Sequence, residues 1–275
     1  MTPTSAGSVG DAIGAAVDAL RAAGVPDARL DAELLLGAAT GWERARLAAD
    51  PAAAVSPAAA RAFGAMLRRR LRREPVAYIL GRKGFRRLEL AVDRRALIPR
   101  PETELLVEVA LELRPRAVLE IGTGCGAVAL AVADELPGCG VTATETATAA
   151  LELARENAAR LGLAERVRFA PGSVPEDIEF DLVLANLPYV RDAELASLAP
   201  EIREWEPLEA LAGGPDGLDV IGEVLPAVAA PVLALEVGAG QAGAVAALLR
   251  GSGFAEVEAR RDLAGIERVI LGRRG

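Results

Sequence analysis

The chain of 275 residues has no histidine, only two cysteines and few aromatic residues. Histidine is the commonest proton-transfer group near neutral pH, so its absence argues against enzymes that depend on it, such as dehydrogenases. The cysteines, Cys125 and Cys139, are too few for a disulfide framework, and the predicted strands give no reason to pair them. This indicates a reducing compartment, for which we expect the cytoplasm.

Signals for export and for membrane insertion are also lacking. No basic segment precedes an apolar core near residue 1, so we expect no secretory signal. The longest apolar stretches, residues 127–133 and 226–237, are too short or too interrupted to cross a bilayer. A net charge of -8 disfavours a general nucleic-acid-binding protein. We expect a soluble monomer that binds no membrane, no metal and no nucleic acid directly.

Basic side chains are nevertheless concentrated between residues 61 and 95, where few acids accompany them. One interpretation is a solvated helix face in a proteome that prefers arginine, because Lys83 is the only lysine. The other is a docking surface for an acidic or RNA-associated partner. Both interpretations stay open. The cluster consists of Arg61, Arg68, Arg69, Arg70, Arg72, Arg73, Arg82, Lys83, Arg86, Arg87, Arg94 and Arg95.

The first 73 residues have the pattern of a small helical bundle. Apolar residues recur at helical spacing in residues 11–23, 28–40 and 56–73, and Ser8 can cap the first of these helices. No catalytic pair stands out, so we predict that residues 1–73 form a domain that recognises a partner. Residues 74–99 contain short alternating runs at 76–80 and 88–92, which predict a β-hairpin linker.

Strand and helix patterns alternate over residues 100–275, beginning with a helix at 100–113. This alternation predicts a doubly wound α/β domain. The last two strand-like runs have no helix between them, so at least one should pair antiparallel. The predicted strands are residues 118–121, 141–144, 167–169, 180–185, 232–237, 254–259 and 268–271. The predicted helices are residues 127–136, 147–161, 218–229 and 241–250.

A glycine-rich loop, residues 120–126, lies where the first strand of this domain turns into a helix. Glycines there allow close approach of a ligand to the backbone, and the helix N-terminus presents unpaired N–H groups. Glu145, at the end of the second strand, would accept a hydrogen bond from a ribose hydroxyl. Gly122, Gly124 and Ala127 also match a dinucleotide fingerprint, so the loop alone does not choose between NAD and S-adenosylmethionine.

A second motif, Asn186-Leu187-Pro188-Tyr189, follows the apolar strand at residues 180–185. The carboxyl end of such a strand is where open α/β sheets bind ligands. The Asn186 side-chain oxygen and the Leu187 carbonyl can each accept one N–H of a planar amide or amine. Pro188 fixes the turn, and Tyr189 can pack on the planar group. Together with the glycine loop, this predicts methylation of a planar nitrogen.

Nearly the whole chain resembles the protein-(glutamine-N5) methyltransferases that modify the Gly-Gly-Gln loop of bacterial peptide chain release factors. The most specific blocks are residues 74–81 (Glu-Pro-Val-Ala-Tyr-Ile-Leu-Gly) and 97–106, which contains Arg100-Pro101-Glu102-Thr103-Glu104. The resemblance also includes the glycine loop, the motif at residues 186–189, and residues 204–208, 235–238 and 261–265.

The resemblance implies a class I S-adenosylmethionine-dependent methyltransferase with a seven-stranded, doubly wound sheet and a small N-terminal helical bundle that engages the release factor. Asn186, Leu187, Pro188 and Tyr189 would hold the glutamine amide, with Asn186, Pro188 and Tyr189 as the catalytic residues. The residues implied to bind the cofactor are Gly122, Thr123, Gly124, Cys125, Gly126, Glu145, Ser173, Val174 and Asn186.

Three positions depart from the family pattern. Leu187 stands where the family usually has proline, so we expect a looser turn that keeps its carbonyl. Glu145 replaces the usual aspartate and reaches further. Ser173-Val174 stands where an acidic residue, often with an aromatic one, contacts the adenine, so we expect lower affinity for the cofactor.

Other functions fit parts of the pattern. Asn-Leu-Pro-Tyr also resembles the motif of ribosomal RNA adenine dimethyltransferases, but those enzymes lack the helical domain and the block at residues 100–106, and a flipped base would need a basic channel. Methylation of a glutamine in a ribosomal protein uses the same chemistry and stays open. A binding protein with a decayed cofactor site is the non-enzymatic alternative, against which the intact glycine loop, Glu145 and Asn186 argue.

Overall fold

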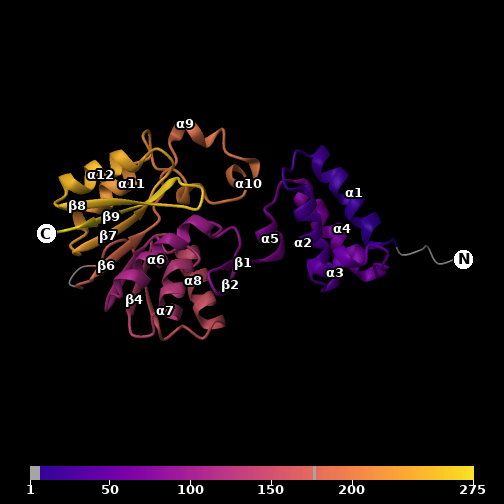
Figure 1. Ribbon diagram of the computed structural model, residues 1–275, viewed down its shortest axis with the longest axis horizontal. Coiled ribbons are helices and arrows are strands. Elements are labelled where there is room, and N and C mark those ends of the chain that lie inside the picture. The colour runs from indigo at the N-terminus through magenta and orange to yellow at the C-terminus, as the bar shows by residue number, and fades with distance from the viewer. Residues whose placement is uncertain (1–6, 176–177) are drawn as a thin grey trace, which may run out of the picture. The chain divides into compact units, whose positions relative to one another are not determined.

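The computed structural model describes residues 7–175 and 178–275, which form two compact units (Figure 1). One unit comprises the chain up to Gly81 together with Pro200–Trp205, and the other comprises Arg82–Ala199 and Glu206–Gly275. Among the described residues, no helix is long and apolar enough to cross a membrane.

The first unit is helical, as predicted. Ser8 caps the first helix through a capping box, in which the Asp11 amide donates to Ser8 Oγ over 3.1 Å and the Ser8 amide donates to Asp11 Oδ2 over 3.3 Å. Ser56 caps the fourth helix in the same way, through the Ala59 amide. The helices are α1 (Val9–Ala22), α2 (Ala28–Thr40), α3 (Arg44–Ala49), α4 (Pro57–Leu71), α5 (Val76–Leu80) and α10 (Pro200–Arg203).

The expected strand at residues 76–80 is wrong, because these residues form helix α5. The adjacent side chains of Tyr78 and Ile79 are both buried, which a strand would place on opposite faces. Gly81 ends the helix in the left-handed conformation, with φ 68°. The hairpin begins after it, as β1 (Arg82–Phe85) paired antiparallel with β2 (Leu88–Ala91), and belongs to the second unit.

A buried ion-pair network joins the helical unit to the segment that returns to it more than a hundred residues later. The Arg70 guanidinium donates over 2.7 Å to Asp31 Oδ2 and over 2.7 Å to Glu201 Oε1, and Arg73 pairs with Glu201 Oε2 at 2.7 Å. Burial raises the pKa of the Asp31 carboxyl against the effect of Arg70. Burial opposes ionisation of Glu201 too, but hydrogen bonds from Arg73 and Arg70 lower its pKa. Arg70 thus pairs with two acids, the buried Asp31 and the partly buried Glu201.

The second unit is built on a seven-stranded sheet in the order β5-β4-β3-β6-β7-β9-β8. Neighbours from β5 to β7 are parallel, whereas β9 pairs antiparallel with both β7 and β8, which confirms the predicted antiparallel pairing. The strands are β3 (Ala117–Ile121), β4 (Gly140–Glu145), β5 (Val167–Pro171), β6 (Leu182–Ala185), β7 (Val232–Glu236), β8 (Glu256–Arg261) and β9 (Glu267–Arg273).

Helices cover this sheet (Figure 1). The predicted helix at residues 218–229 is shorter than expected, because Pro226 converts its last turn to a 3-10 helix, Leu225–Ala227. The helices are α6 (Glu104–Leu113), α7 (Ala127–Glu135), α8 (Thr148–Arg160), α9 (Asp192–Leu195), α11 (Asp219–Val224) and α12 (Ala242–Gly251). Two further 3-10 turns are η1 (Pro101–Thr103) and η2 (Leu208–Ala210).

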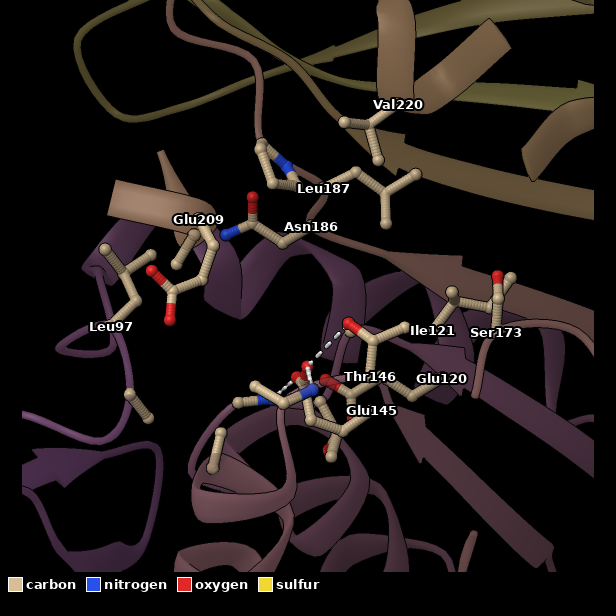
Figure 2. A pocket seen from close by; sticks show the side chains of 18 of the residues that line it. Leu97, Glu120, Ile121, Glu145, Thr146, Ser173, Asn186, Leu187, Glu209 and Val220 are labelled. Atoms are coloured by element: carbon tan, nitrogen blue, oxygen red, sulfur yellow. Dashed lines mark hydrogen bonds between the residues drawn. The ribbon is translucent and has the colours of Figure 1, made fainter. Parts of the chain in front are cut away.

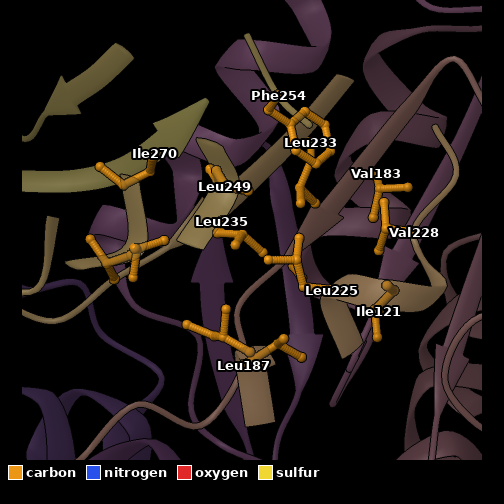
Figure 3. Close-up of a cluster of buried hydrophobic side chains, with 14 of the residues drawn as sticks. Ile121, Val183, Leu187, Leu225, Val228, Leu233, Leu235, Leu249, Phe254 and Ile270 are labelled. Carbon is orange, nitrogen blue, oxygen red and sulfur yellow. The ribbon is translucent and has the colours of Figure 1, made fainter. Parts of the chain in front are cut away.

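One core cluster extends along β3, β6 and β7 (Figure 3). It includes Ile121 from β3, Leu235 from β7 and Leu225 from the turn after α11. Leu187, which follows β6, belongs to the same cluster and is 5% exposed. The segment that carries the predicted acceptor motif is therefore anchored by hydrophobic burial.

We predict that Arg70→Ala destabilises the helical unit by about 3–5 kcal/mol, because it leaves Asp31 buried without its cation, while Glu201 keeps its pair with Arg73. Both tryptophans of the chain, Trp42 and Trp205, belong to this unit, so urea unfolding followed by tryptophan fluorescence reports on it selectively. Arg68→Ala, at an exposed position of the same helix, is the control. Equal midpoints for the two variants would contradict the prediction.

Candidate active site

The order of the strands determines where a ligand can bind. The chain proceeds from β3 outward to β4 and β5 and then returns to β6 on the other side of β3. In open α/β sheets, the crevice at such a switch point, at the carboxyl ends of the strands, is the binding site. The glycine loop follows β3 and the Asn186 motif follows β6, so the two predicted motifs meet there.

A cavity of about 640 Å³ occupies this crevice (Figure 2). That volume is within the usual range for small-molecule sites. Figure 2 shows Asn186, Leu97 and Glu209 on one side of the cavity, with Glu120, Glu145 and Thr146 grouped below them. The predicted site residues that line it are Gly122, Thr123, Gly124, Cys125, Glu145, Ser173, Val174, Asn186, Leu187 and Pro188.

Hydrogen bonds to the last two residues of β4 hold the glycine loop in place. The amides of Gly122 and Thr123 both donate to the Thr144 carbonyl, over 2.9 and 3.0 Å. Gly122 and Gly124 adopt positive φ angles of 72° and 56°, which side chains rarely tolerate. Glu145 Oε2 accepts from the Gly124 amide over 2.9 Å. The carboxylate therefore orders the loop as well as facing the cavity.

Gly126 was predicted to bind the cofactor, but it does not line the described cavity. It adopts a φ of 89° at the N-cap of α7, where a Cβ atom would lie 2.9 Å from Leu130 Cδ1 and 3.3 Å from Ala154 Cβ. Its place in the structure is to let the loop pack closely on the neighbouring helices.

Glu120 is a buried carboxyl of the site that sequence analysis did not single out. It accepts from Thr123 Oγ1 over 2.5 Å and from the Ala129 amide over 2.8 Å. Burial raises its pKa to about 8, although both hydrogen bonds oppose this shift. Cys125, beside it, is also buried, and burial raises the pKa of its thiol to about 12, so the thiol is not a nucleophile at neutral pH.

The Asn186 side chain lies on the cavity wall, and its Nδ2 donates to Thr103 Oγ1 over 3.3 Å. Pro188 also lines the cavity. Tyr189 lies behind the wall formed by the described residues, where its hydroxyl donates to Glu236 Oε1 over 3.3 Å. Burial raises the pKa of Tyr189. Its predicted packing on a planar substrate stays a prediction.

The acceptor motif is braced from behind by a loop and a helix end. Gln241 is buried, and its Nε2 donates to the Tyr189 carbonyl over 2.9 Å. Gly213 lies so close that a Cβ atom there would be 2.8 Å from the Pro188 carbonyl oxygen and 2.8 Å from Tyr189 Cα. The amide of Gly213 donates to the Val190 carbonyl over 2.9 Å. These contacts fix the backbone of the motif.

Two blocks that carry the family resemblance, residues 97–106 and 204–208, meet at the rim of the cavity. Glu206 accepts from the Arg100 guanidinium over 2.5 Å and from the Ile98 amide over 3.2 Å. Asn157 makes a second connection: its Nδ2 donates to the carbonyls of Cys125 and Ala91, which ties the hairpin to the glycine loop. The blocks are thus interlocking parts of one site.

Comparisons with known proteins agree with this geometry. Residues 11–81 match the PrmC N-terminal domain, and residues 101–202 match the methyltransferase small domain. The release factor glutamine methyltransferase of Cereibacter sphaeroides is 42% identical over 96% of this chain and 97% of its own length. That of Rhodospirillum rubrum is 40% identical over 93% of this chain and 82% of its own length.

The chain belongs to the release factor glutamine methyltransferase family. Among solved structures, the hMettl16 catalytic domain in complex with the MAT2A 3′UTR hairpin 6 has a TM-score of 0.55 at 15% identity, covering 67% of this chain and 74% of that one. This likeness shows a shared methyltransferase fold. The predicted fold class is therefore confirmed.

The cofactor of this methyltransferase is S-adenosylmethionine, and the residues of the cavity fit it. The backbone of Gly122 and Gly124 leaves room for close approach, and the Glu145 carboxylate can accept from ribose hydroxyls. Ser173 Oγ lines the same cavity, is buried and has no hydrogen-bond partner among the described residues. A buried hydroxyl without a partner is costly unless a ligand supplies one, and the adenine amine is such a ligand group.

The contacts made by several residues of the site could not be predicted from the sequence. Glu206 and Thr103 lie within blocks that the family resemblance had already marked, so their positions were available but their contacts were not. Glu236 stands in a third such block. Gln241, Gly213 and Asn157 act through contacts with residues far along the chain, which a single sequence does not reveal.

We predict that Gly213→Ala lowers the rate of methyl transfer by roughly ten- to a hundredfold, because the new Cβ would push on the backbone of Pro188 and Tyr189. Gly222→Ala in α11 is the control, since a Cβ atom there meets nothing within 4 Å. Steady-state rates and circular dichroism of both variants make the test. A Gly213→Ala enzyme that is folded and as fast as the control would contradict it.

Proposed function

We propose that the protein transfers a methyl group from S-adenosylmethionine to the side-chain amide nitrogen, N5, of the glutamine in the Gly-Gly-Gln loop of peptide chain release factors. One observation carries this proposal. The Asn186 side chain and the glycine loop line the same cavity, at the switch point between β3 and β6. An amide held by Asn186 would therefore face a cofactor held by the loop.

Methyl transfer to an amide requires the protein to position the nitrogen rather than to supply a strong base. An amide nitrogen is a poor nucleophile because its lone pair is delocalised. Asn186 Oδ1 and the Leu187 carbonyl would each accept one N–H and aim the nitrogen at the donor. When bound, S-adenosylmethionine supplies a methyl group on a positively charged sulfur. The methyl–sulfur bond would break as the C–N bond forms, leaving a neutral thioether, and one N–H proton would pass to solvent.

Leu187 restrains the acceptor turn in a different way from the proline that the family usually has at this position. Proline would restrain the turn through its ring. Here the side chain of Leu187 packs into the core with Ile121 and Leu235, and a Cβ atom on Gly122 would lie 3.6 Å from Leu187 Cδ2. Burial thus couples the acceptor turn to the cofactor loop, which supports an active enzyme over a decayed binding protein.

The charge of the cavity favours a protein substrate over a nucleic acid. Its wall carries the carboxyl groups of Glu120, Glu145, Glu209 and Glu223. Its two arginines are already paired, Arg95 with Asp93 and Glu156, and Arg100 with Glu206. A nucleotide substrate would bring phosphates that this wall does not neutralise.

We propose that the helical unit, which comprises the chain up to Gly81 and Pro200–Trp205, recognises the release factor, and that the unit containing the hairpin and the seven-stranded sheet carries out methyl transfer. The match of the helical unit to the PrmC N-terminal domain supports the first of these roles. We further propose that the enzyme acts as a monomer in the cytoplasm, without binding nucleic acid. Glutamine methylation of a ribosomal protein remains the closest alternative, with identical chemistry at the site.

We predict that labelled S-adenosylmethionine transfers its methyl group to a release factor with glutamine in the Gly-Gly-Gln loop and not to one with alanine there. Asn186→Ala should lower this transfer by about a hundredfold or more, since the amide loses an acceptor, while affinity for the cofactor stays close to wild type. Transfer to neither substrate would refute the proposed function, and near-normal turnover by Asn186→Ala would refute the role of this side chain.

We also predict that Ser173→Asp binds S-adenosylmethionine more tightly, by about tenfold, because a carboxylate would make a charge-assisted hydrogen bond to the adenine amine where the Ser173 hydroxyl makes a neutral one. Ser173→Ala should bind more weakly than wild type. Calorimetric titration of the three proteins gives the order of affinities. No gain in Ser173→Asp would count against placing the adenine at this position.

A further inference from the structure

Asn186 is the first of a row of polar groups that runs through Thr103, which also lines the cavity, to Glu236, which does not. Thr103, at the end of η1, accepts a hydrogen bond from Asn186 Nδ2 over 3.3 Å and is 5% exposed. The next group is the carboxyl of Glu236, at the end of β7, whose charged form is stabilised by the hydroxyls of Thr103 and Tyr189. Glu236 is 1% exposed. The three elements η1, β6 and β7 therefore meet at one buried polar cluster.

The chemistry of these groups fixes the direction of their hydrogen bonds. An ionised carboxylate can only accept, so Glu236 takes the single proton of the Thr103 hydroxyl. The oxygen of Thr103 is then free to accept, and it draws the NH₂ half of the Asn186 amide toward itself. The Asn186 oxygen then stays available to accept from a substrate amide. A flipped amide would instead place two donors against the donors of a substrate amide.

We propose that Thr103 and Glu236 are positioning residues, which hold the Asn186 amide with its oxygen toward the substrate through a directed relay from carboxylate to hydroxyl to amide. The proposal rests on the proposed function, because it assigns the orientation that methyl transfer to an amide nitrogen requires. Glu236 does not line the described cavity, so it would act through Thr103 and not by touching the substrate. Their effect is on the rate at which bound substrate reacts.

The charge of Glu236 decides the direction of this relay. Burial raises the pKa of its carboxyl to about 7, with Glu102 raising it further and Arg268 lowering it. Its Oε2 is buried and has no hydrogen-bond partner in the described part of the chain. A protonated Glu236 could donate to Thr103, and Thr103 could then donate to a flipped Asn186. The productive orientation therefore belongs to the ionised form, which predominates above this pKa.

The test compares Thr103→Val, Thr103→Ser and Glu236→Gln in methyl transfer to a release factor. At saturating substrate and cofactor, Thr103→Val should lower kcat by about tenfold, the equivalent of one hydrogen bond, with little change in KM. Thr103→Ser, which keeps the hydroxyl, should restore most of the rate. Thr142→Val, which removes a buried hydroxyl from β4, is the matched control and should keep the wild-type kcat.

The dependence of kcat on pH supplies a readout that a purely structural role would not move. In wild type, kcat should rise with pH through about 7 and level off above, because the ionised form of Glu236 is the active one. Glu236→Gln should lose this limb. Burial also raises the pKa of Glu120, to about 8, so the loss of the limb near 7 in Glu236→Gln, rather than its presence in wild type, identifies Glu236.

The outcomes separate this inference from the proposed function. A wild-type enzyme that methylates no release factor defeats the function and the relay together. An active wild type with Thr103→Val as fast as Thr142→Val defeats the relay alone. An equally slow Thr103→Ser, or a pH limb that persists in Glu236→Gln, also overturns it. A slow Thr103→Val, a rescued Thr103→Ser and a lost limb together establish it.

Discussion

The reversal of strand order between β3 and β6 is the constraint on which the site depends. It brings the loop after one strand and the turn after another to the same edge of the sheet, although some sixty residues separate them along the chain. The buried side chain of Leu187 then joins the two, because it packs beneath Gly122 in the core that supports both. Donor and acceptor parts of the site are thus set on one rigid base.

Sequence patterns predicted this arrangement well where the signal was local. Short apolar runs marked all seven strands of the sheet, Ser8 marked the start of α1, and the apolar spacing of residues 56–73 marked α4. Alternation failed at residues 76–80, where Tyr78 and Ile79 are buried side by side in a helix of five residues. Five residues make little more than one helical turn, and over that length the apolar pattern of a helix cannot be told from that of a strand.

The parts of the site that could not be predicted are those that long-range contacts create. In the sequence, Glu206 is one of several acids in a short stretch. In the structure it is buried, because Arg100 and the Ile98 amide, about a hundred residues earlier in the chain, donate hydrogen bonds to it. Gly213 and Gln241 likewise matter only because they contact the backbone of Pro188 and Tyr189. Their spacing in sequence follows no period, because loops of different lengths bring them together.

The return of Pro200–Trp205 to the helical unit has a consequence for the modularity of this architecture. The chain leaves the helical unit at Gly81 and forms strands β3 to β6. It then returns to the helical unit with Glu201 before it forms β7 to β9. A piece cut off at Gly81 would keep Arg70 and Asp31 but forfeit the second acid of their network. The helices therefore cannot be transplanted as a contiguous cassette, and recombination that joins them to another catalytic core must carry this distant patch along.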